Sequence, residues 1–412
     1  MGYYTVNGKN RLMGEVNIQG SKNSAVAILM ASLITDGETV LTNLPRISDV
    51  ALCIKILRLL GCTVIYESPD SVRINTRHAS YAPLPPEITS GMRASSYLIG
   101  ALTARFGECA LPTSGGCDFG QRPIDMHLDA LKSLGACEAD GLLKAEKGLV
   151  GTRIRFPQKT VGGTVNAVIA ASKANGLTVI ENAAREPHVK DLCAFLGKCG
   201  ADIIGAGTDT VRIRGRRILH GSAHKIDGDM IETGTYICAA LATHGAIRCT
   251  SAPSYELEAF FDVLGRIGAD IDVDFDTVTV RSNKLLAVNA STAPYPYLAT
   301  DLQPQLCALL GLAEGKSKIT ETVFEKRFGY LNELKRFGLN CRESGNTAEI
   351  IGINGYTPAT VTATDLRGGA AAVICALNAN GKSVIHGTEL IERGYSDMPE
   401  KLRSLGAEVF KG

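Results

Sequence analysis

Apolar and polar positions recur along this chain with a period of about 69 residues. In each period an apolar, helix-like run ends at a glycine, a short strand-like run follows, and an amphipathic run ends at a second glycine. Glycine suits the end of a helix because it accepts left-handed backbone dihedrals. The first series is Gly37, Gly107, Gly176, Gly245, Gly315 and Gly381, and the second is Gly61, Gly135, Gly200, Gly268, Gly338 and Gly406. Six such units account for the 412 residues.

Each unit is predicted to contain an inner helix, a strand, an outer helix and two further strands. The inner helices, for example residues 25–34 and 304–312, are apolar on almost every side, so we expect them to be buried. The outer helices, for example residues 189–196 and 398–405, carry polar residues at helical spacing and should have one solvated face. The pattern predicts an α/β protein.

The sixth unit is incomplete, because only six residues follow Gly406 and its last strand is missing. The N-terminal segment Tyr3–Val6 has the right length and composition, and we predict that it completes this unit, since an unpaired strand edge is unfavourable. Six units with buried inner helices are too many to share one hydrophobic core of ordinary size, so we expect two domains of three units each. These are residues 20–227, and residues 1–19 with 228–412. Two chain crossings between domains suggest a hinge that closes on a ligand.

The charge and composition exclude several classes of function. With 43 basic and 42 acidic residues, the chain is not held to nucleic acid or to a membrane by bulk charge. No apolar run approaches the roughly 20 residues of a membrane span, and the first residues lack the pattern of a signal peptide, so we expect a cytoplasmic protein. Twelve cysteines without a C-x-x-C pair predict reduced thiols, most of them in the core.

Several cations precede predicted helices and are candidates for binding an anion. Lys22 stands before the first inner helix, where a helix N-terminus attracts anions and a lysine is unfavourable without one. An ordinary exposed lysine after a capping serine is an equally good interpretation. Single arginines in such places usually form ion pairs, but together they suit phosphate and carboxylate. They are Arg93, Arg122, Arg185, Arg327, Arg367 and Arg393.

A long glycine-rich link, residues 112–127, carries the one cysteine that lies outside an apolar stretch. Three glycines surround Cys117, and Arg122 and His127 follow it. An exposed thiol beside cations is a candidate nucleophile or acid. The alternative is a buried cysteine in a surface loop, but the polar flanks favour a functional thiol.

Three aspartates precede inner helices: Asp229, Asp301 and Asp365. Aspartate is a preferred helix N-cap, and its repetition supports a capping role. The local sequence does not choose a catalytic carboxylate among the three.

Taken together, these motifs resemble the enolpyruvyl transferases over essentially the whole chain. The resemblance implies a two-domain inside-out α/β barrel, with six βαβαββ repeats arranged three plus three. It is carried by Arg11–Val16, Gly20–Asn23, Met92–Ser95, Gly115–Cys117, Arg122–Asp125, Glu181–Pro187, Ile231–Thr235, Thr300–Gln303, Glu321–Glu325, Ala363–Arg367 and Glu392–Tyr395.

The resemblance also implies a reaction: transfer of the enolpyruvyl group of phosphoenolpyruvate to the 3'-hydroxyl of UDP-N-acetylglucosamine, with release of phosphate, the first committed step of peptidoglycan synthesis. It makes Cys117 the proton donor and the target of fosfomycin, Asp301 the general base, and Lys22 a ligand of phosphoenolpyruvate. We expect a monomer that needs no metal or other cofactor. The substrate-binding residues implied are Asn23, Arg93, Arg122, Pro123, Ile124, Asp125, Met126, Val323, Arg327, Arg367 and Arg393.

Two alternatives stay open. The first is 3-phosphoshikimate 1-carboxyvinyltransferase, which shares the fold and the donor but lacks the Gly-Gly-Cys loop. The second is a catalytically silent paralogue that binds a sugar nucleotide, which should have lost Cys117, Asp301 or Lys22, although all three are present. One departure from the family concerns the nucleotide: the segment Gln158–Thr160 stands where the family usually has a lysine that contacts the nucleotide, and the register of Lys159 within it is left open.

Overall fold

The computed structural model describes residues 2–85, 96–110, 124–139 and 141–412, so the predicted site residues Arg93, Cys117, Arg122 and Pro123 lie outside the described residues. The fold is mixed α/β and divides into two compact units, residues 20–227 (the first unit) and residues 1–19 with 228–412 (the second unit). The described strands form six small sheets, three in each unit. None of the described helices combines the length and the apolar character needed to cross a membrane.

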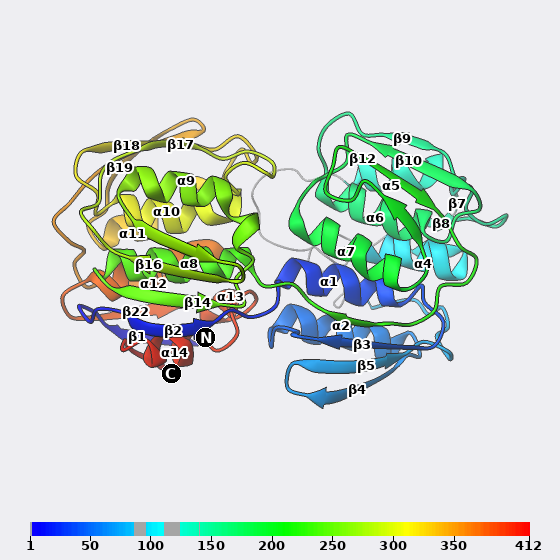
Figure 1. The fold of residues 1–412 in the computed structure, drawn as a ribbon, viewed down its shortest axis with the longest axis horizontal. Helices are drawn as coiled ribbons and strands as arrows, with labels where there is room; N and C mark the ends of the chain where they lie inside the picture. Colours follow the sequence, from blue (N-terminus) through cyan, green and yellow to red (C-terminus); the bar gives the residue numbers. More distant parts are fainter. Residues whose placement is uncertain (1, 86–95, 111–123, 140) are drawn as a thin grey trace. The chain divides into compact units, whose positions relative to one another are not determined.

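The sheets of the first unit have the strand orders β13-β3-β5-β4, β6-β8-β7 and β11-β12-β10-β9. The elements of this unit can be followed in Figure 1. Its strands are β3 (Glu38–Thr42), β4 (Thr63–Ser68), β5 (Ser71–Asn75), β6 (Glu108–Ala110), β7 (Cys137–Ala139), β8 (Leu142–Lys144), β9 (Arg153–Arg155), β10 (Leu177–Glu181), β11 (Asp202–Ile204), β12 (Thr210–Arg214) and β13 (Ala223–Lys225). Its helices are α1 (Lys22–Ser32), α2 (Ser48–Leu59), α4 (Leu98–Phe106), α5 (Asp125–Ser133), α6 (Val161–Ala171) and α7 (Pro187–Lys198).

The sheets of the second unit have the strand orders β21-β22-β1-β23, β15-β16-β14-β2 and β17-β18-β20-β19. Its strands are β1 (Tyr3–Asn7), β2 (Met13–Asn17), β14 (Ala246–Thr250), β15 (Asp270–Asp274), β16 (Thr277–Arg281), β17 (Asn289–Ser291), β18 (Lys316–Thr320), β19 (Asn340–Ser344), β20 (Thr347–Ile351), β21 (Thr360–Thr362), β22 (Lys382–His386) and β23 (Glu408–Lys411). Its α-helices are α8 (Met230–Ala242), α9 (Glu258–Ile267), α10 (Gln303–Leu310), α11 (Leu331–Arg336), α12 (Leu366–Asn378), α13 (Thr388–Ile391) and α14 (Met398–Ser404), and short 3₁₀ turns cover Ser254–Glu256, Thr300–Leu302 and Phe328–Tyr330.

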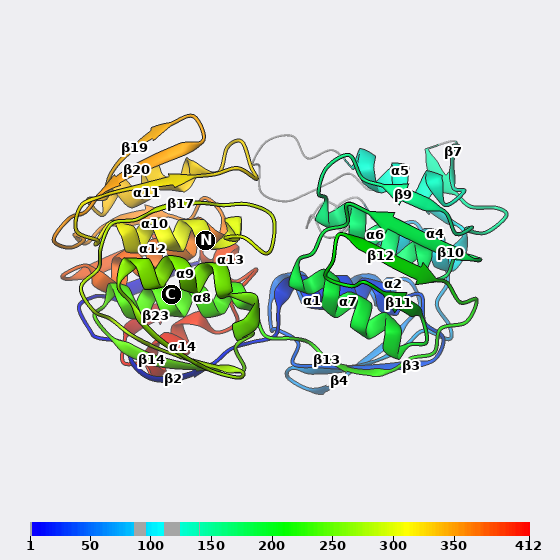
Figure 2. The same ribbon diagram turned by 45° about the horizontal axis from the view of Figure 1, so that its top comes forward.

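The predicted inner helices form the centre of each unit. In the second unit α8, α10 and α12 pack against one another, and Figure 2 shows them side by side in its interior. In the first unit α6 packs against α4, α5 and α7, and every residue of α6 from Gly163 to Ala171 is buried. The prediction of buried inner helices is confirmed. Burial of so much apolar surface is the main source of stability in a fold of this kind.

The N-terminal strand completes a sheet whose other strands come from the end of the chain. Strand β1 lies antiparallel between β22 and β23, with Tyr4 opposite Ile385 on one side and Val6 opposite Val409 on the other. The backbones of Tyr3 and Gly412 exchange hydrogen bonds of 3.2 and 2.9 Å. The prediction that residues 3–6 complete the last unit is confirmed.

The glycines that mark the repeat adopt the expected backbone conformation with one exception. All six glycines of the second series have φ between 80° and 103°. Five of the first series have φ between 80° and 133°, but Gly245 does not, and His244 takes the left-handed conformation instead, with φ 54°. A glycine is still required there, because a Cβ on Gly245 would lie 2.1 Å from the carbonyl oxygen of Leu12.

The described cysteines are free thiols. All of them are buried except Cys137, which is exposed, and Cys341, which is intermediate. This agrees with the prediction that most cysteines are small core residues, and burial accordingly raises the pKa of Cys62 to about 11.

Candidate active site

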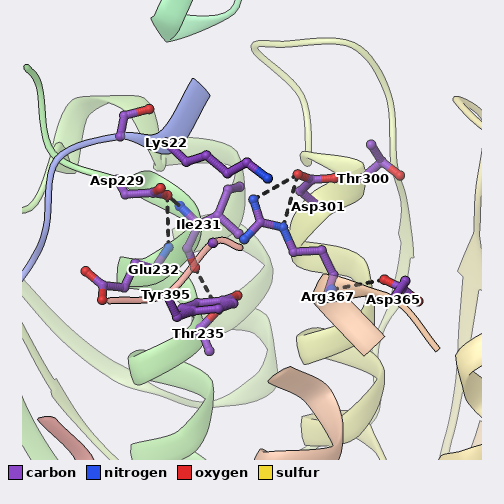
Figure 3. A network of polar contacts seen from close by, with 12 residues as sticks. Lys22, Asp229, Ile231, Glu232, Thr235, Thr300, Asp301, Asp365, Arg367 and Tyr395 are labelled. Carbon is purple, nitrogen blue, oxygen red and sulfur yellow. Dashed lines mark hydrogen bonds and ion pairs between the residues drawn. The ribbon is translucent and has the colours of Figure 1, made fainter. Parts of the chain in front are cut away.

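Asp301 lies between two buried arginines in the second unit. Its Oδ1 accepts a hydrogen bond of 3.0 Å from Nη2 of Arg327. Its Oδ2 accepts two hydrogen bonds of 3.1 Å from Nε and Nη2 of Arg367. The side chains of Arg327 and Arg367 are only 3% and 6% exposed, whereas that of Asp301 is 30% exposed. Two buried cations therefore fix the carboxylate, and part of the Asp301 side chain remains exposed to solvent. Figure 3 shows the Arg367–Asp301 contact.

The two other candidate aspartates have a different role. Asp229 caps α8 by accepting hydrogen bonds from the backbone N–H groups of Ile231 and Glu232, at 2.8 and 3.1 Å. Asp365 caps α12 in the same way, with N–H groups of Arg367 and Gly368 at 2.9 and 3.0 Å (Figure 3). Asp301 sits in a 3₁₀ turn before α10, and no side-chain cap is made there. The capping interpretation thus holds for two aspartates but not for Asp301, which is held by arginines.

The environment of Arg367 keeps it charged. Burial lowers the pKa of its guanidinium, but Asp301, Tyr395 and Asp229 together outweigh this effect, so the pKa is raised above its usual value. The guanidinium also lies over the ring of Tyr395, 5.6 Å from its centroid. Burial in turn raises the pKa of the Tyr395 hydroxyl, which stays protonated and can donate a hydrogen bond.

Glu321 links this cluster to the segment that carries Val323. Its Oε2 accepts a hydrogen bond of 2.8 Å from the hydroxyl of Thr300, the residue before Asp301. Its Oε1 accepts hydrogen bonds from the backbone N–H groups of Val323 and Phe324, at 2.8 and 3.2 Å. The side chain is 1% exposed. One buried carboxylate therefore sets the position of two predicted functional residues, Asp301 and Val323.

In the first unit, Lys22 is the first residue of α1 and follows the capping serine Ser21, whose hydroxyl accepts from the N–H of Ser24. Its Nζ lies 2.8 Å from Oδ2 of Asp49, and the two side chains are 15% and 6% exposed. Lys22 is thus a largely buried, oriented cation, and the interpretation of an ordinary exposed lysine is wrong. Asn23, the next residue, also belongs to α1.

The start of α5 contains three predicted substrate contacts. Ile124 is its N-cap residue, and Asp125 and Met126 form its first turn. His127 was expected in an exposed loop, but it is buried in the same turn, 3% exposed, and its Nδ1 accepts a hydrogen bond of 2.9 Å from the amide of Asn166. The ring packs against α6 so closely that a Cβ on Gly162 would lie 2.4 Å from Cε1. The role of His127 here is to fix the start of α5.

Three other predicted cations lie on other segments of the chain. Lys159 forms an ion pair with Asp209 and donates to the carbonyl oxygen of Ala183 at 3.1 Å. Arg185 donates from Nε to the carbonyl oxygen of Gly207 at 3.2 Å. Arg393 is half-buried in the turn that follows α13. Lys159 and Arg185 therefore contact residues of the first unit, whereas Asp301, Arg327 and Arg367 form one cluster within the second unit.

Sequence reasoning missed the carboxylates that orient the functional side chains. Asp49 and Glu321 appear in the sequence as an acid at a helix start and an acid at a strand end, and both patterns are common. Their roles depend on contacts with residues that lie 27 and 21 positions away. Only the repeat could have drawn attention to such links, because it places equivalent loops together.

Comparisons with known proteins place this chain in one family. Residues 6–402 match the family model described as EPSP synthase (3-phosphoshikimate 1-carboxyvinyltransferase). The chain is 41% identical to UDP-N-acetylglucosamine 1-carboxyvinyltransferase 2 of Caldanaerobacter subterraneus subsp. tengcongensis, with 100% of both chains covered. It is 42% identical to UDP-N-acetylglucosamine 1-carboxyvinyltransferase of Pasteurella multocida, with 98% of this chain and 97% of the relative covered.

Solved structures agree with this assignment. The crystal structure of the enolpyruvyl transferase NikO from Streptomyces tendae matches with a TM-score of 0.90 at 28% identity, covering 100% of this chain and 99% of that chain. EPSP synthase from Acinetobacter baumannii matches with a TM-score of 0.79 at 18% identity over 100% of both chains, which shows the shared fold. The chain belongs to the EPSP synthase family of enolpyruvyl transferases.

Proposed function

We propose that this protein transfers the enolpyruvyl group of phosphoenolpyruvate to the 3'-hydroxyl of UDP-N-acetylglucosamine and releases phosphate, the first committed step of peptidoglycan synthesis. The observation that carries the chemistry is the Asp301 carboxylate, held by Arg327 and Arg367 and only partly exposed. The choice of acceptor is supported by 41–42% identity over nearly the whole chain to enzymes named for that acceptor.

Three residues are assigned to the chemical steps. Cys117 donates a proton to the methylene carbon of phosphoenolpyruvate, which leaves an oxocarbenium-like centre at the neighbouring carbon. The 3'-hydroxyl attacks that centre, and Asp301 accepts the hydroxyl proton as a general base. The Cys117 thiolate takes back a proton from the new methyl group as phosphate departs, which regenerates the double bond and the thiol. Lys22, oriented by Asp49, stabilises negative charge on phosphoenolpyruvate.

The remaining assignments concern substrate binding. Arg122 and Arg393 join Lys22 in holding the phosphate and the carboxylate of the donor, for which guanidinium groups are well suited. The arginines beside Asp301 keep the base in a fixed orientation, so that it is aligned with the hydroxyl when the acceptor binds. The residues assigned to the sugar nucleotide and the surrounding site are Asn23, Arg93, Pro123, Ile124, Asp125, Met126, Val323, Arg327 and Arg367.

The finer description of the fold is part of the same proposal. Five of the six described sheets contain a strand that pairs in parallel with the strand following an inner helix, as β2 does with β14 and β17 does with β18. This supports six βαβαββ repeats, three in each unit, in an inside-out α/β barrel. We also propose that the protein acts as a monomer in the cytoplasm.

Phosphate release from phosphoenolpyruvate tests the function directly. The purified protein is assayed with UDP-N-acetylglucosamine or with shikimate 3-phosphate as acceptor, and the product is identified by mass. We expect release with the sugar nucleotide only. Release with shikimate 3-phosphate would instead assign the rival acceptor, and release with neither would support the silent paralogue.

A pair of matched variants tests the role of Asp301 in this assay. Asp301→Asn keeps the size and part of the hydrogen bonding but removes the basic oxygen, so turnover should be lost. Asp262→Asn makes the same chemical change at an exposed residue of α9 in the same unit and should retain turnover. Full activity of Asp301→Asn would contradict the assignment of the base.

A further inference from the structure

The turn that carries Arg393 has no regular secondary structure of its own. It connects α13 to α14, and its backbone contacts within the turn include hydrogen bonds from the N–H groups of Gly394 and Tyr395 to the carbonyl oxygen of Ile391, at 3.0 and 3.2 Å. Contacts that hold this turn from outside therefore also contribute to the placement of Arg393.

The side chain of Gln19 holds the turn with both ends of its amide. Nε2 donates a hydrogen bond of 2.8 Å to the carbonyl oxygen of Gly394, and Oε1 accepts one of 2.7 Å from the N–H of Ser396. The residue is 7% exposed, so these bonds are shielded from water. An amide offers a donor and an acceptor from one planar group, which lets Gln19 pair with this backbone as a neighbouring strand would.

Gln19 is itself fixed in place. Its N–H donates to Oε2 of Glu232 at 2.7 Å, and its carbonyl oxygen accepts from the N–H of Asp229 at 2.9 Å, so its backbone is attached to the start of α8. The other carboxylate oxygen of Glu232, Oε1, accepts a hydrogen bond of 2.8 Å from Nζ of Lys401 on α14. The backbone of Gln19 is thus fixed to the start of α8, and its side-chain amide positions the turn relative to that helix.

The same turn touches the Asp301 cluster. The hydroxyl of Tyr395 lies 2.8 Å from Oγ1 of Thr235 on α8 and receives a hydrogen bond of 3.2 Å from Nε2 of Gln305 on α10. The ring of Tyr395 lies beneath the guanidinium of Arg367. Moving the backbone of residues 394–396 would therefore disturb Arg393 on one side and the support of Arg367 on the other.

We propose that Gln19 is a positioning residue that sets the direction of Arg393 by clamping the backbone of residues 394–396. The inference rests on the proposed role of Arg393 in binding phosphoenolpyruvate. The fold does not depend on this clamp alone, because the flanking residues Ile391 and Met398 are 0% and 1% exposed and anchor both ends of the turn. Loss of the amide should leave a folded protein whose arginine is poorly aligned.

The first test is Gln19→Met, which keeps the length of the side chain and removes both hydrogen bonds. We expect the KM for phosphoenolpyruvate to rise about tenfold, with a smaller change in the KM for UDP-N-acetylglucosamine. Asn17→Ala is the matched control, because Asn17 lies two residues earlier on β2 and its amide oxygen binds the hydroxyl of Ser251 on the surface. Thermal unfolding of each variant separates misalignment from loss of fold.

A double-mutant cycle shows whether Gln19 acts through Arg393. In an Arg393→Ala background, Gln19→Met should add no further rise in the KM for phosphoenolpyruvate. Independent, multiplying effects in the double variant would overturn the proposal, and so would an unchanged KM in a stably folded Gln19→Met protein. Absence of turnover in the wild type is a separate outcome that overturns the proposed function, and this inference with it.

Gln19→Glu gives a readout that a purely structural role would not move. Its carboxylate keeps the acceptor for Ser396 but loses the donor for Gly394, and protonation restores an O–H donor. The KM of this variant for phosphoenolpyruvate, divided by the wild-type value at each pH, should fall as the pH is lowered from about 8 to 6. A ratio that does not change with pH would contradict the clamp.

Discussion

Glu232 should make the second unit less stable as the pH rises through neutrality. The side chain is fully buried, and this burial raises the pKa of Glu232 to about 7, although Lys401 and the N–H of Gln19 both favour the ionised form. The ordinary value of 4.5 applies to the unfolded chain. The folded protein therefore binds the proton more tightly, so the stabilising contribution is complete below about pH 4.5 and is lost as the pH rises through about 7.

The size of the effect follows from the two pKa values. Between pH 5 and pH 8 the contribution of Glu232 to the free energy of unfolding should fall by about 2.5 kcal/mol. Glu232→Gln removes this titration and keeps an acceptor for the N–H of Gln19. The variant also removes the carboxylate partner of Lys401. That loss changes the free energy of unfolding, but residue 232 no longer titrates, so it adds no pH dependence from this position.

Urea denaturation of wild type and Glu232→Gln at several pH values measures this difference. Histidines and other carboxylates titrate in both proteins, so the difference in free energy isolates residue 232. Relative to the wild type, the variant should gain about 2.5 kcal/mol between pH 5 and pH 8. The control Glu15→Gln, an exposed carboxylate on β2, should show no such trend. A constant difference for Glu232→Gln would refute the reasoning, and a trend of opposite sign would show that pairing with Lys401 outweighs burial.

Four further outcomes are expected. Asp301→Asn should lower turnover by about 100- to 10,000-fold in the phosphate-release assay while calorimetry still detects UDP-N-acetylglucosamine binding. Fosfomycin should add its mass to the protein at Cys117, as seen by intact-mass measurement, and Cys117→Ser should block the addition; an unmodified wild type would argue against the assignment. Asp49→Asn should raise the KM for phosphoenolpyruvate about tenfold by loosening Lys22, and an unchanged KM would show that Asp49 does not orient Lys22 for binding this substrate. Asp365→Ala should lower the free energy of unfolding by about 1 kcal/mol through loss of the α12 cap, measured by urea denaturation.

The repeating part of the fold could be predicted from the sequence because it is local. A buried inner helix and its terminal glycine can be recognised within about 15 residues, from the hydrophobic periodicity and from the glycine at the position that needs left-handed dihedrals. The pairing of Tyr3–Val6 with the last sheet was also accessible, since the repeat made the missing strand visible. Gly245 shows the limit of this reasoning: the glycine is needed for close packing against Leu12, and the left-handed residue is its neighbour His244.

The candidate site was less accessible, because the side chains that decide it come together from distant segments. Asp229, Asp301 and Asp365 look equivalent in the sequence, and only their contacts separate two helix caps from a carboxylate held by arginines. His127 resembled a loop cation beside Cys117, but the buried amide of Asn166 turns it toward the interior. Long-range hydrogen bonds of this kind have no local signature in one sequence.

The second unit is discontinuous, and this affects the order in which a ribosome can build the protein. Strand β1 emerges early, yet its partners β22 and β23 begin 379 and 405 residues after Tyr3. At about 5–20 residues per second, the N-terminal strand waits for tens of seconds, while the first unit has all of its own segments available much sooner. The nascent chain should therefore acquire the first unit before the second, and agents that shield a free β-strand during translation should matter most for the opening residues.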